Sequence, residues 1–371
     1  MNSKRQRRLA AALTLAVAAT LLSACAGNQA TVSEDGTPAD AQTQGGAYTI
    51  ALSNSYLGNS WRQTMVKVFE ETAEQAKKDG LIAEYSVSNT SQNTATEQIA
   101  QIKSLILKHP DAILVDSASP TALNSVIEDA CDAGIKVVVF DSLASADCEY
   151  DVVNGLKEVG YLEAKMVADA MGGSGNLLMV RGIVGSQPEN EVYSGQLEAL
   201  GEYPDIEVVK EVVGQASDSV AQEAVQEVLP SLPQIDGVLT AGATNGVLKA
   251  LEAAGKPLPA AVFDNTGEGL RYWQELASSQ EYKGGSVRND PGQAAAAIWV
   301  ALALLNGQDV PKTTTLPNVV ISQDELAEWI DVTPAGSVAA WPWTREQTEQ
   351  AVTASKDGNT VDPLPVPTAA P

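Results

Sequence analysis

The chain has little histidine, little cysteine and few positive charges. It contains one histidine, His109, and three cysteines in 371 residues. A zinc site or a histidine-dependent hydrolase needs more ligands than this, so we expect no metal and no cofactor. Acidic residues outnumber basic ones by 47 to 23, which gives a formal net charge of −24. Because such a surface repels phosphate backbones, we expect no nucleic-acid partner.

The N-terminal region lacks an apolar run long enough for a stable membrane span. Residues 9–22 are apolar, but they are too few, and they follow a basic head that includes Lys4 and Arg5. This pattern predicts an export signal over residues 1–24. Cys25 directly follows Leu-Ser-Ala and resembles the lipobox cysteine of bacterial lipoproteins, which implies lipidation at Cys25. The alternative is an ordinary cleaved signal with an incidental cysteine.

The predicted export signal places the protein outside the cytoplasm. Through Cys25 it would be anchored by lipid to the outer face of the cell membrane, with no other membrane contact. Cys131 and Cys148 then form an even pair in an oxidising compartment, which favours a disulfide. Two buried free thiols are the alternative.

Both ends of the chain are poor in large apolar residues. Residues 25–46 are small and polar, and they read as a lipidated cysteine followed by a flexible tether. Residues 351–371 read as a proline-rich tail. Trp341 and Trp343 flank a proline shortly before it. They could cap a cleft or pin the last segment to the core, and we favour pinning.

Between these ends, short apolar runs alternate with helical patterns. The runs are continuous rather than alternating, as is typical of a parallel sheet covered by helices on both faces. Two such series lie end to end, which predicts an α/β protein with two doubly wound parallel-sheet domains. The expected strands are 48–52, 82–87, 111–115 and 137–140 in the first series, and 177–180, 206–213, 237–240 and 261–263 in the second.

The loops that follow these strands carry the polar groups of interest, because parallel sheets bind ligands outside the carboxyl ends of their strands. Asn59, Trp61 and Arg62 follow the first strand, whereas Asp141 and Asp264 each follow a later one. Sugar hydroxyls both donate and accept hydrogen bonds, and indole rings pack on sugar C–H faces. The alternatives are a helix cap for each aspartate, a core position for the tryptophan and a surface ion pair for the arginine.

Residues 47–330 resemble the type I periplasmic binding proteins, in particular the ribose- and galactofuranose-type sugar receptors of ABC transporters. The motifs that carry the resemblance are Gly-Asn-Ser-Trp-Arg at 58–62, Val-Phe-Asp at 139–141 and Val-Phe-Asp at 262–264. The resemblance implies the following ligand contacts: Asn59, Trp61, Arg62, Asp141, Asn190, Asp264 and Asn289.

The sequence departs from that family at four positions. Ser142 stands where the family commonly has an arginine, and Asn190 lies near another expected arginine. The dipeptide Gly242-Ala243 stands in place of an Asn-Asp pair, with Asn245 slightly further on, and Ser217 replaces an aromatic residue. These changes leave the fold and role intact, but the ligand need not be ribose. The missing arginines argue against a strongly anionic ligand.

The resemblance also implies how the chain is divided. It would cross three times between domains, with 47–155 and about 289–320 in the first domain and 156–288 and about 321–350 in the second. A ligand cleft would lie between the two domains. A small neutral sugar or polyol would favour closure of the cleft, and the closed monomer would dock on an ABC permease.

Other functions fit less well. A transcription regulator of this fold would need an N-terminal helix-turn-helix for DNA binding. This sequence has the lipobox and the tether there instead. A hydrolase could use Asp141 and Asp264 as a carboxylate pair, but no nucleophile elbow or phosphate loop supports catalysis, so we expect no enzyme. A tethered sensor for chemotaxis or quorum signalling would have the same fold, and the sequence does not separate it from a transport receptor.

Overall fold

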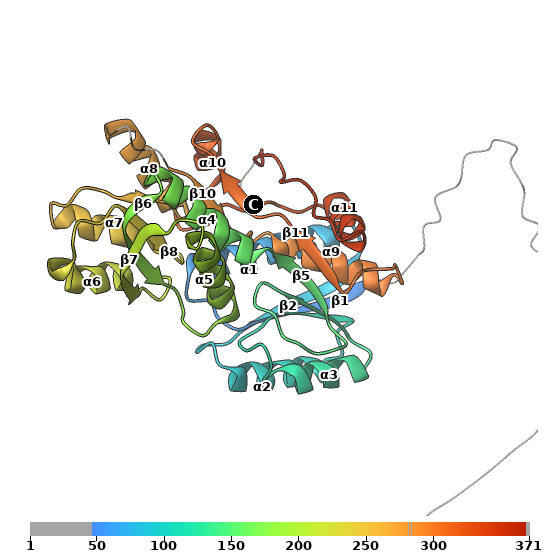
Figure 1. Cartoon of the computed structure of the whole chain (residues 1–371). Helices are drawn as coiled ribbons and strands as arrows, with labels where there is room; N and C mark the ends of the chain where they lie inside the picture. The colour runs from blue at the N-terminus through green and yellow to red at the C-terminus, as the bar shows by residue number, and fades with distance from the viewer. Residues whose placement is uncertain (1–46, 281, 283, 369–371) are drawn as a thin grey trace, which may run out of the picture. The chain divides into compact units, whose positions relative to one another are not determined.

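Two parallel sheets form the framework of the computed structural model (Figure 1), which describes residues 47–280, 282 and 284–368. The predicted export signal, the lipidation site at Cys25 and the tether lie outside the described residues. Within those residues, the sheets have strand orders β11-β5-β4-β3-β1-β2 and β7-β6-β8-β9. These two sheets confirm the predicted doubly wound α/β architecture.

The first lobe is the six-stranded sheet with the helices packed on it. Its strands are β1 (Tyr48–Asn54), β2 (Ile82–Asn89), β3 (Ala112–Asp116), β4 (Lys136–Phe140), β5 (Tyr150–Asn154) and β11 (Thr313–Leu316). Its helices are α1 (Ser60–Lys78), α2 (Ala95–Ile106), α3 (Asn124–Asp132), α9 (Gln293–Leu305) and α11 (Arg345–Lys356). The described strand pairs of this sheet are parallel.

The second lobe is the four-stranded sheet with its helices. Its strands are β6 (Ser174–Arg181), β7 (Asp205–Val213), β8 (Gly237–Thr240) and β9 (Ala260–Ala261). Its helices are α4 (Leu156–Ala170), α5 (Gln187–Leu200), α6 (Asp218–Val228), the 3₁₀ turn η1 (Leu229–Ser231), α7 (Thr244–Ala253), α8 (Gly267–Gln280) and α10 (Leu326–Val332). Beside this lobe, β10 (Ser286–Arg288) pairs antiparallel with β12 (Val319–Ile321).

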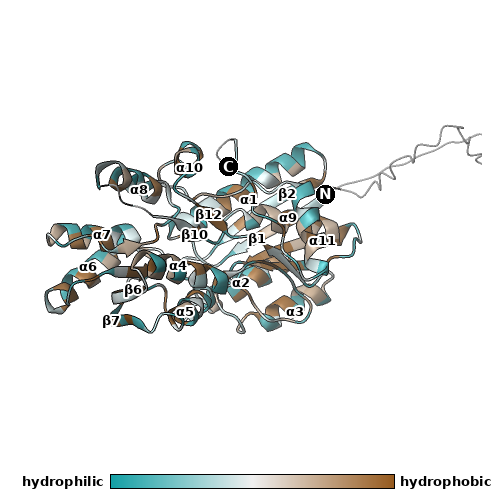
Figure 2. Ribbon diagram, turned by 45° about the horizontal axis from the view of Figure 1, so that its top comes forward, coloured by the Kyte–Doolittle hydropathy of each residue, from teal (hydrophilic) through white to brown (hydrophobic). Residues whose placement is uncertain are grey.

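Helices cover both faces of the first sheet. Leu114 of β3 packs in the cluster formed with α1 and α9, whereas its neighbours Ile113 and Val115 pack with α2 and α3. Successive strand residues point to opposite faces, so a continuous apolar run fills two layers at once. In Figure 2, the helices that cover the sheets show both hydrophobic and hydrophilic colours, as expected for amphipathic helices.

Three segments carry the chain between the two sheets within the described residues. They are β5 to α4, β10 to α9, and β11 to β12. Asn154 holds them together: its Nδ2 donates to the carbonyl oxygen of Pro317 at 2.7 Å, and its Oδ1 accepts from the Asp290 amide at 3.2 Å. We call these three segments the hinge.

Some elements differ from the sequence expectations. Strands β5, β11 and β12 were not expected, because each is short and the first two carry polar residues. The boundary expected at residue 350 falls inside α11, which runs to Lys356 and packs against α9 and β11. Trp341 and Trp343 are buried beside Trp329, as expected for a pinned segment.

A disulfide joins Cys131 of α3 to Cys148 in the loop before β5. The prediction of this pairing is therefore confirmed. The bond ties the helix before β4 to the loop after it, and Asp141 lies at the start of that loop. No helix among the described residues is long and apolar enough to cross a membrane.

Candidate ligand-binding site

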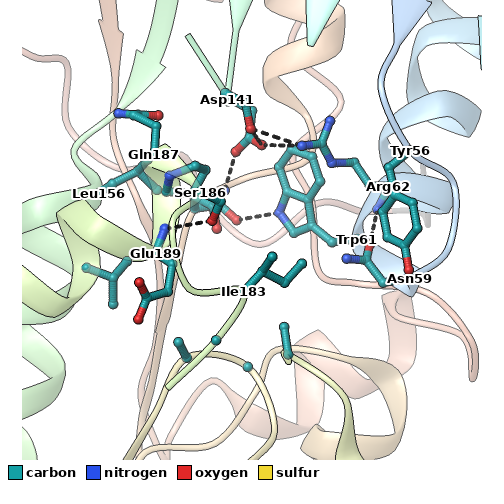
Figure 3. Close-up of a pocket in the computed structure, with 18 of the residues that line it drawn as sticks. Tyr56, Asn59, Trp61, Arg62, Asp141, Leu156, Ile183, Ser186, Gln187 and Glu189 are labelled. Carbon is teal, nitrogen blue, oxygen red and sulfur yellow. Dashed lines mark hydrogen bonds and ion pairs between the residues drawn. The ribbon is translucent and has the colours of Figure 1, made fainter. Parts of the chain in front are cut away.

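A cavity of about 470 Å³ lies between the two lobes, beyond the carboxyl ends of their strands (Figure 3). Its volume is in the usual range for small-molecule sites. Six of the residues predicted from the sequence line it: Asn59, Trp61, Arg62, Asp141, Asp264 and Asn289. Both sets of strand-end loops therefore meet at one site.

Asn190 is the predicted contact that the structure does not bring to the cavity. Its side chain is exposed on α5, whereas Gln187 and Glu189 of the same helix line the cavity. Val192 also lines the cavity, and a side chain two positions earlier on a helix points about 200° away from it, so Asn190 faces solvent.

Arg62 organises the wall of the first lobe. The Asn59 side chain caps α1 by accepting a hydrogen bond from the Arg62 amide at 2.8 Å, which fixes the start of the helix. The Arg62 guanidinium forms an ion pair with the buried Asp116, lies 3.3 Å from Asp141 and donates to the Ser142 hydroxyl at 3.0 Å. Ser142 thus serves as an acceptor for Arg62 where the family commonly has a second arginine.

Asp141 has an unusual backbone conformation. Its φ of 57° lies in the left-handed region, which costs energy for a residue with a side chain. Asn289 donates to its Oδ1 at 2.7 Å, and Gln293 accepts from its amide at 3.2 Å. Burial raises the pKa of Asp141 and lowers that of Arg62, whereas their opposite charges act against both shifts.

Trp61 places an aromatic surface beside these polar groups. Its indole Nε1 donates to the Asn289 carbonyl oxygen at 3.2 Å, and the Arg62 guanidinium lies 5.5 Å from its ring centroid. The ring is therefore tied to the hinge while one part of it faces the cavity, which suits stacking on an apolar C–H surface.

The second lobe presents an equivalent ion pair. Arg288 donates to Asp264 Oδ1 from Nη2 at 2.6 Å and also pairs with the buried Glu163 of α4. The Thr244 amide, at the start of α7, donates to Asp264 Oδ2 at 2.8 Å. Burial and the negative charge of Asp218 raise the pKa of Asp264 to about 7, and burial lowers that of Arg288 to about 10.

The rest of the second wall is mixed. Glu189 is held by an ion pair with Arg181, whose guanidinium stacks on the Tyr193 ring at 3.3 Å from its centroid. Leu156 and Ile183 add apolar surface (Figure 3). Both apolar and hydrogen-bonding groups therefore line this wall of the cavity.

Several polar residues of the site were not expected from the sequence. Arg288 is adjacent to Asn289 at the end of β10, and the strand-end rule could have found it. Glu163 lies within α4, and Gln293 lies in the first turn of α9. No local pattern marks these helix positions, because only tertiary packing brings Glu163 to the cavity and Gln293 into contact with Asp141.

The arrangement favours binding of a neutral, hydroxyl-rich molecule. Each arginine already has two carboxylate partners from its own lobe: Asp116 and Asp141 for Arg62, and Glu163 and Asp264 for Arg288. Neither guanidinium is therefore left unpaired to require an anionic ligand. The described residues contain no cluster of three His, Cys, Asp or Glu side chains that could hold a metal ion.

The chain is similar to known proteins over most of its length. The profile described as periplasmic binding protein domain matches residues 50–309. A xylitol-binding protein from Mycolicibacterium smegmatis is 29% identical over 65% of this chain and 69% of its own length.

Solved structures extend the comparison to the whole fold. An ABC transporter solute-binding protein from Thermobispora bispora is 47% identical, with a TM-score of 0.80 over 86% of this chain and 99% of that one. A periplasmic solute-binding protein from Actinobacillus succinogenes, solved with bound D-allose, is 26% identical, with a TM-score of 0.67 over 76% of this chain and 99% of that one. The chain therefore belongs to the periplasmic binding protein domain family.

Proposed function

We propose that this protein is an extracytoplasmic solute-binding lipoprotein that captures a small neutral sugar or polyol and delivers it to an ABC permease. The observation that carries the proposal is that both arginines of the cavity are already paired with carboxylates. Arg62 with Asp141, and Arg288 with Asp264, offer hydrogen-bond donors and acceptors from both lobes, and neither arginine needs an anionic ligand as a partner. Hydroxyl groups can satisfy both kinds of partner.

Names of similar proteins support the same ligand class. A relative is named for xylitol, and a similar structure holds D-allose. These are a five-carbon polyol and a six-carbon sugar, and a cavity of about 470 Å³ has room for either. We propose Asn59, Trp61, Arg62, Asp141, Asp264 and Asn289 as the contact residues.

The domain division supports capture by closure. We propose that residues 47–155 and 289–320, with α11 packed against α9 and β11, move as one body against residues 156–288 and 321–336, about the hinge. Only closure lets the ligand contact both walls, so the ligand favours the closed state. Binding, rather than catalysis, is the activity that this geometry supports.

Export and anchoring belong to the same proposal. Residues 1–25 carry the basic head, the apolar run and the lipobox-like cysteine. Cys25→Ala should release the protein from the membrane fraction of cells, whereas the wild-type protein should remain there. Incorporation of labelled palmitate into the wild-type protein, but not the variant, measures the lipid directly.

A thermal-shift screen tests the ligand class. Xylitol, D-allose, D-ribose and a set of amino acids are added separately to the purified protein. A ligand at a hundredfold excess over its dissociation constant stabilises the folded state by about 2.7 kcal/mol, which raises the melting temperature measurably. A shift with amino acids alone would contradict the sugar or polyol assignment.

A further inference from the structure

The segment after α10 lies between the two lobes, beyond the residues matched by the family profile. Figure 1 shows the chain passing from α10, beside α8, to α11 on the first lobe. Residues 337–343 connect these positions, and we call them the strap. The strap makes hydrogen bonds with both sides of the cavity.

The N-terminal part of the strap is bonded to the second lobe. Val338 pairs antiparallel with Thr266, directly after the proposed contact residue Asp264 and its neighbour Asn265. The Gly267 amide donates to the Ser337 carbonyl oxygen at 2.9 Å, and the Ala339 amide donates to the Asn265 carbonyl oxygen at 2.8 Å. These bonds form a short two-stranded ladder on one wall of the cavity.

The other part of the strap is bonded to the hinge segment between β10 and α9, where the chain enters the first lobe. Asp290 Oδ2 accepts from the Trp343 indole at 2.8 Å, and Asp290 Oδ1 accepts from the Trp341 amide at 3.2 Å. A Cβ atom at Gly292 would lie 2.0 Å from the Trp341 carbonyl oxygen, so the close approach of the strap requires glycine there.

Val338 joins the two sets of contacts. Its backbone pairs with the second lobe, but its amide donates to the Thr64 hydroxyl on α1 of the first lobe at 3.0 Å. Val338 is 3% exposed and lines the cavity. Thr64 lies three residues after Trp61, whose indole bonds Asn289, so Val338 contributes to the wall near the hinge.

We propose that the strap is a fourth connection between the lobes in the described part of the chain, and that Val338 on it is a specificity-determining residue of the cavity. The proposal rests on the proposed function and deepens it. The hinge and the strap both reach the cavity, but the strap adds an apolar side chain held from both lobes. A ligand that closes the lobes would meet this side chain at a fixed place, which limits ligand size there.

The first test measures selectivity. Isothermal titration calorimetry gives the dissociation constants of D-allose and xylitol for the full-length protein and for Val338→Ala. Removing two methyl groups from the cavity wall should favour the larger D-allose, and the ratio of the two constants should change by about tenfold. Val225→Ala is the matched control, because Val225 is equally buried but does not line the cavity.

The second test needs no ligand. Thr64→Val removes the acceptor of the Val338 amide while it conserves shape, so hydrogen exchange should accelerate at least tenfold across residues 336–340. Thr64→Ser keeps the hydroxyl, so the amide hydrogens of residues 336–340 should exchange at the wild-type rate in that variant. Thr348→Val is the control, because Thr348 is buried to the same degree but bonds within its own helix.

The outcomes separate the two proposals. A selectivity ratio within twofold of wild type in Val338→Ala, or unchanged exchange in Thr64→Val, would overturn the role given to the strap. If no sugar or polyol of the thermal-shift screen bound the wild-type protein, the proposed function and the selectivity role of Val338 would both be contradicted. The exchange measurement would still decide whether the Thr64 hydroxyl holds the strap against the first lobe.

Discussion

The Asn289 side chain donates a hydrogen bond of 2.7 Å to Asp141 Oδ1, across 148 positions of the sequence. Asn289 lies in the hinge, and Asp141 follows β4 with its backbone in the left-handed region. This bond therefore connects the hinge to a cavity-lining residue whose backbone is strained. Strain of this kind persists only where neighbouring groups hold it.

Asn289→Ala should weaken ligand binding. A hydrogen bond to a charged group contributes about 1.5–3 kcal/mol, so we expect a loss of affinity of roughly 10–100-fold. Calorimetric titration with the sugar or polyol that stabilises the wild-type protein measures this loss. Asn190→Ala is the matched control: it removes the same side chain from an exposed position outside the cavity and should change affinity less than twofold. Equal losses in both variants would contradict the assignment of Asn289.

Arg62→Met should destabilise the fold as well as the site. Asp116 is fully buried and pairs with Arg62, so removing the guanidinium leaves an uncompensated buried charge. The expected cost is about 3–5 kcal/mol in the free energy of unfolding, measured by urea denaturation. Adding Asp116→Asn should recover part of that cost. If the double variant were no more stable than Arg62→Met, the Asp116 charge would not be its source.

The sequence predicts the parts of the fold whose signal is local. The apolar runs of β1, β3 and β4 identify buried parallel strands. Asp141 and Asp264 each follow a strand whose carboxyl end lies at the cavity. Each of these assignments depends only on residues that are close together in the sequence. The sequence alone was therefore enough to predict them.

The parts that the sequence did not predict depend on distant contacts. Strand β11 pairs with β5 through Thr313 and Asp151, and neither strand has an apolar run that marks it. Glu163 reaches the site only because α4 packs beside β10, which carries Arg288. Whether the Asn190 side chain faces the cavity depends on its position around the axis of α5, and the sequence of the preceding loop does not determine that position.

The Cys131–Cys148 disulfide should contribute to stability. The bond closes a loop with a sequence separation of 17, and a loop of that length is expected to stabilise the fold by about 3 kcal/mol. Replacing both cysteines with alanine should lower the free energy of unfolding by that amount in urea. Mass spectrometry of an unreduced digest should find the two peptides linked, and two free thiols would contradict the pairing.

Stability should also depend on pH, because buried carboxyl groups bind protons more tightly in the folded state. Burial raises the pKa of Asp290 to about 7, although the Trp343 indole and two amides oppose the shift. Burial likewise raises the pKa of Asp264 and Glu149 to about 7. A carboxyl whose folded pKa lies above its unfolded value stabilises the fold at low pH, and that contribution is lost as pH rises through the folded pKa.

The free energy of unfolding should therefore fall as the pH rises from 5 to 8, and Asp290→Asn should make that fall smaller. The variant loses the acceptor for the Trp343 indole, which lowers stability by an amount that does not vary with pH. The change in slope, rather than the absolute stability, reports the titration of Asp290. Urea denaturation at pH 5, 6, 7 and 8 measures both slopes, with Asp205→Asn as a control at an exposed position. Parallel curves for Asp290→Asn and wild type would show that Asp290 does not titrate in this range.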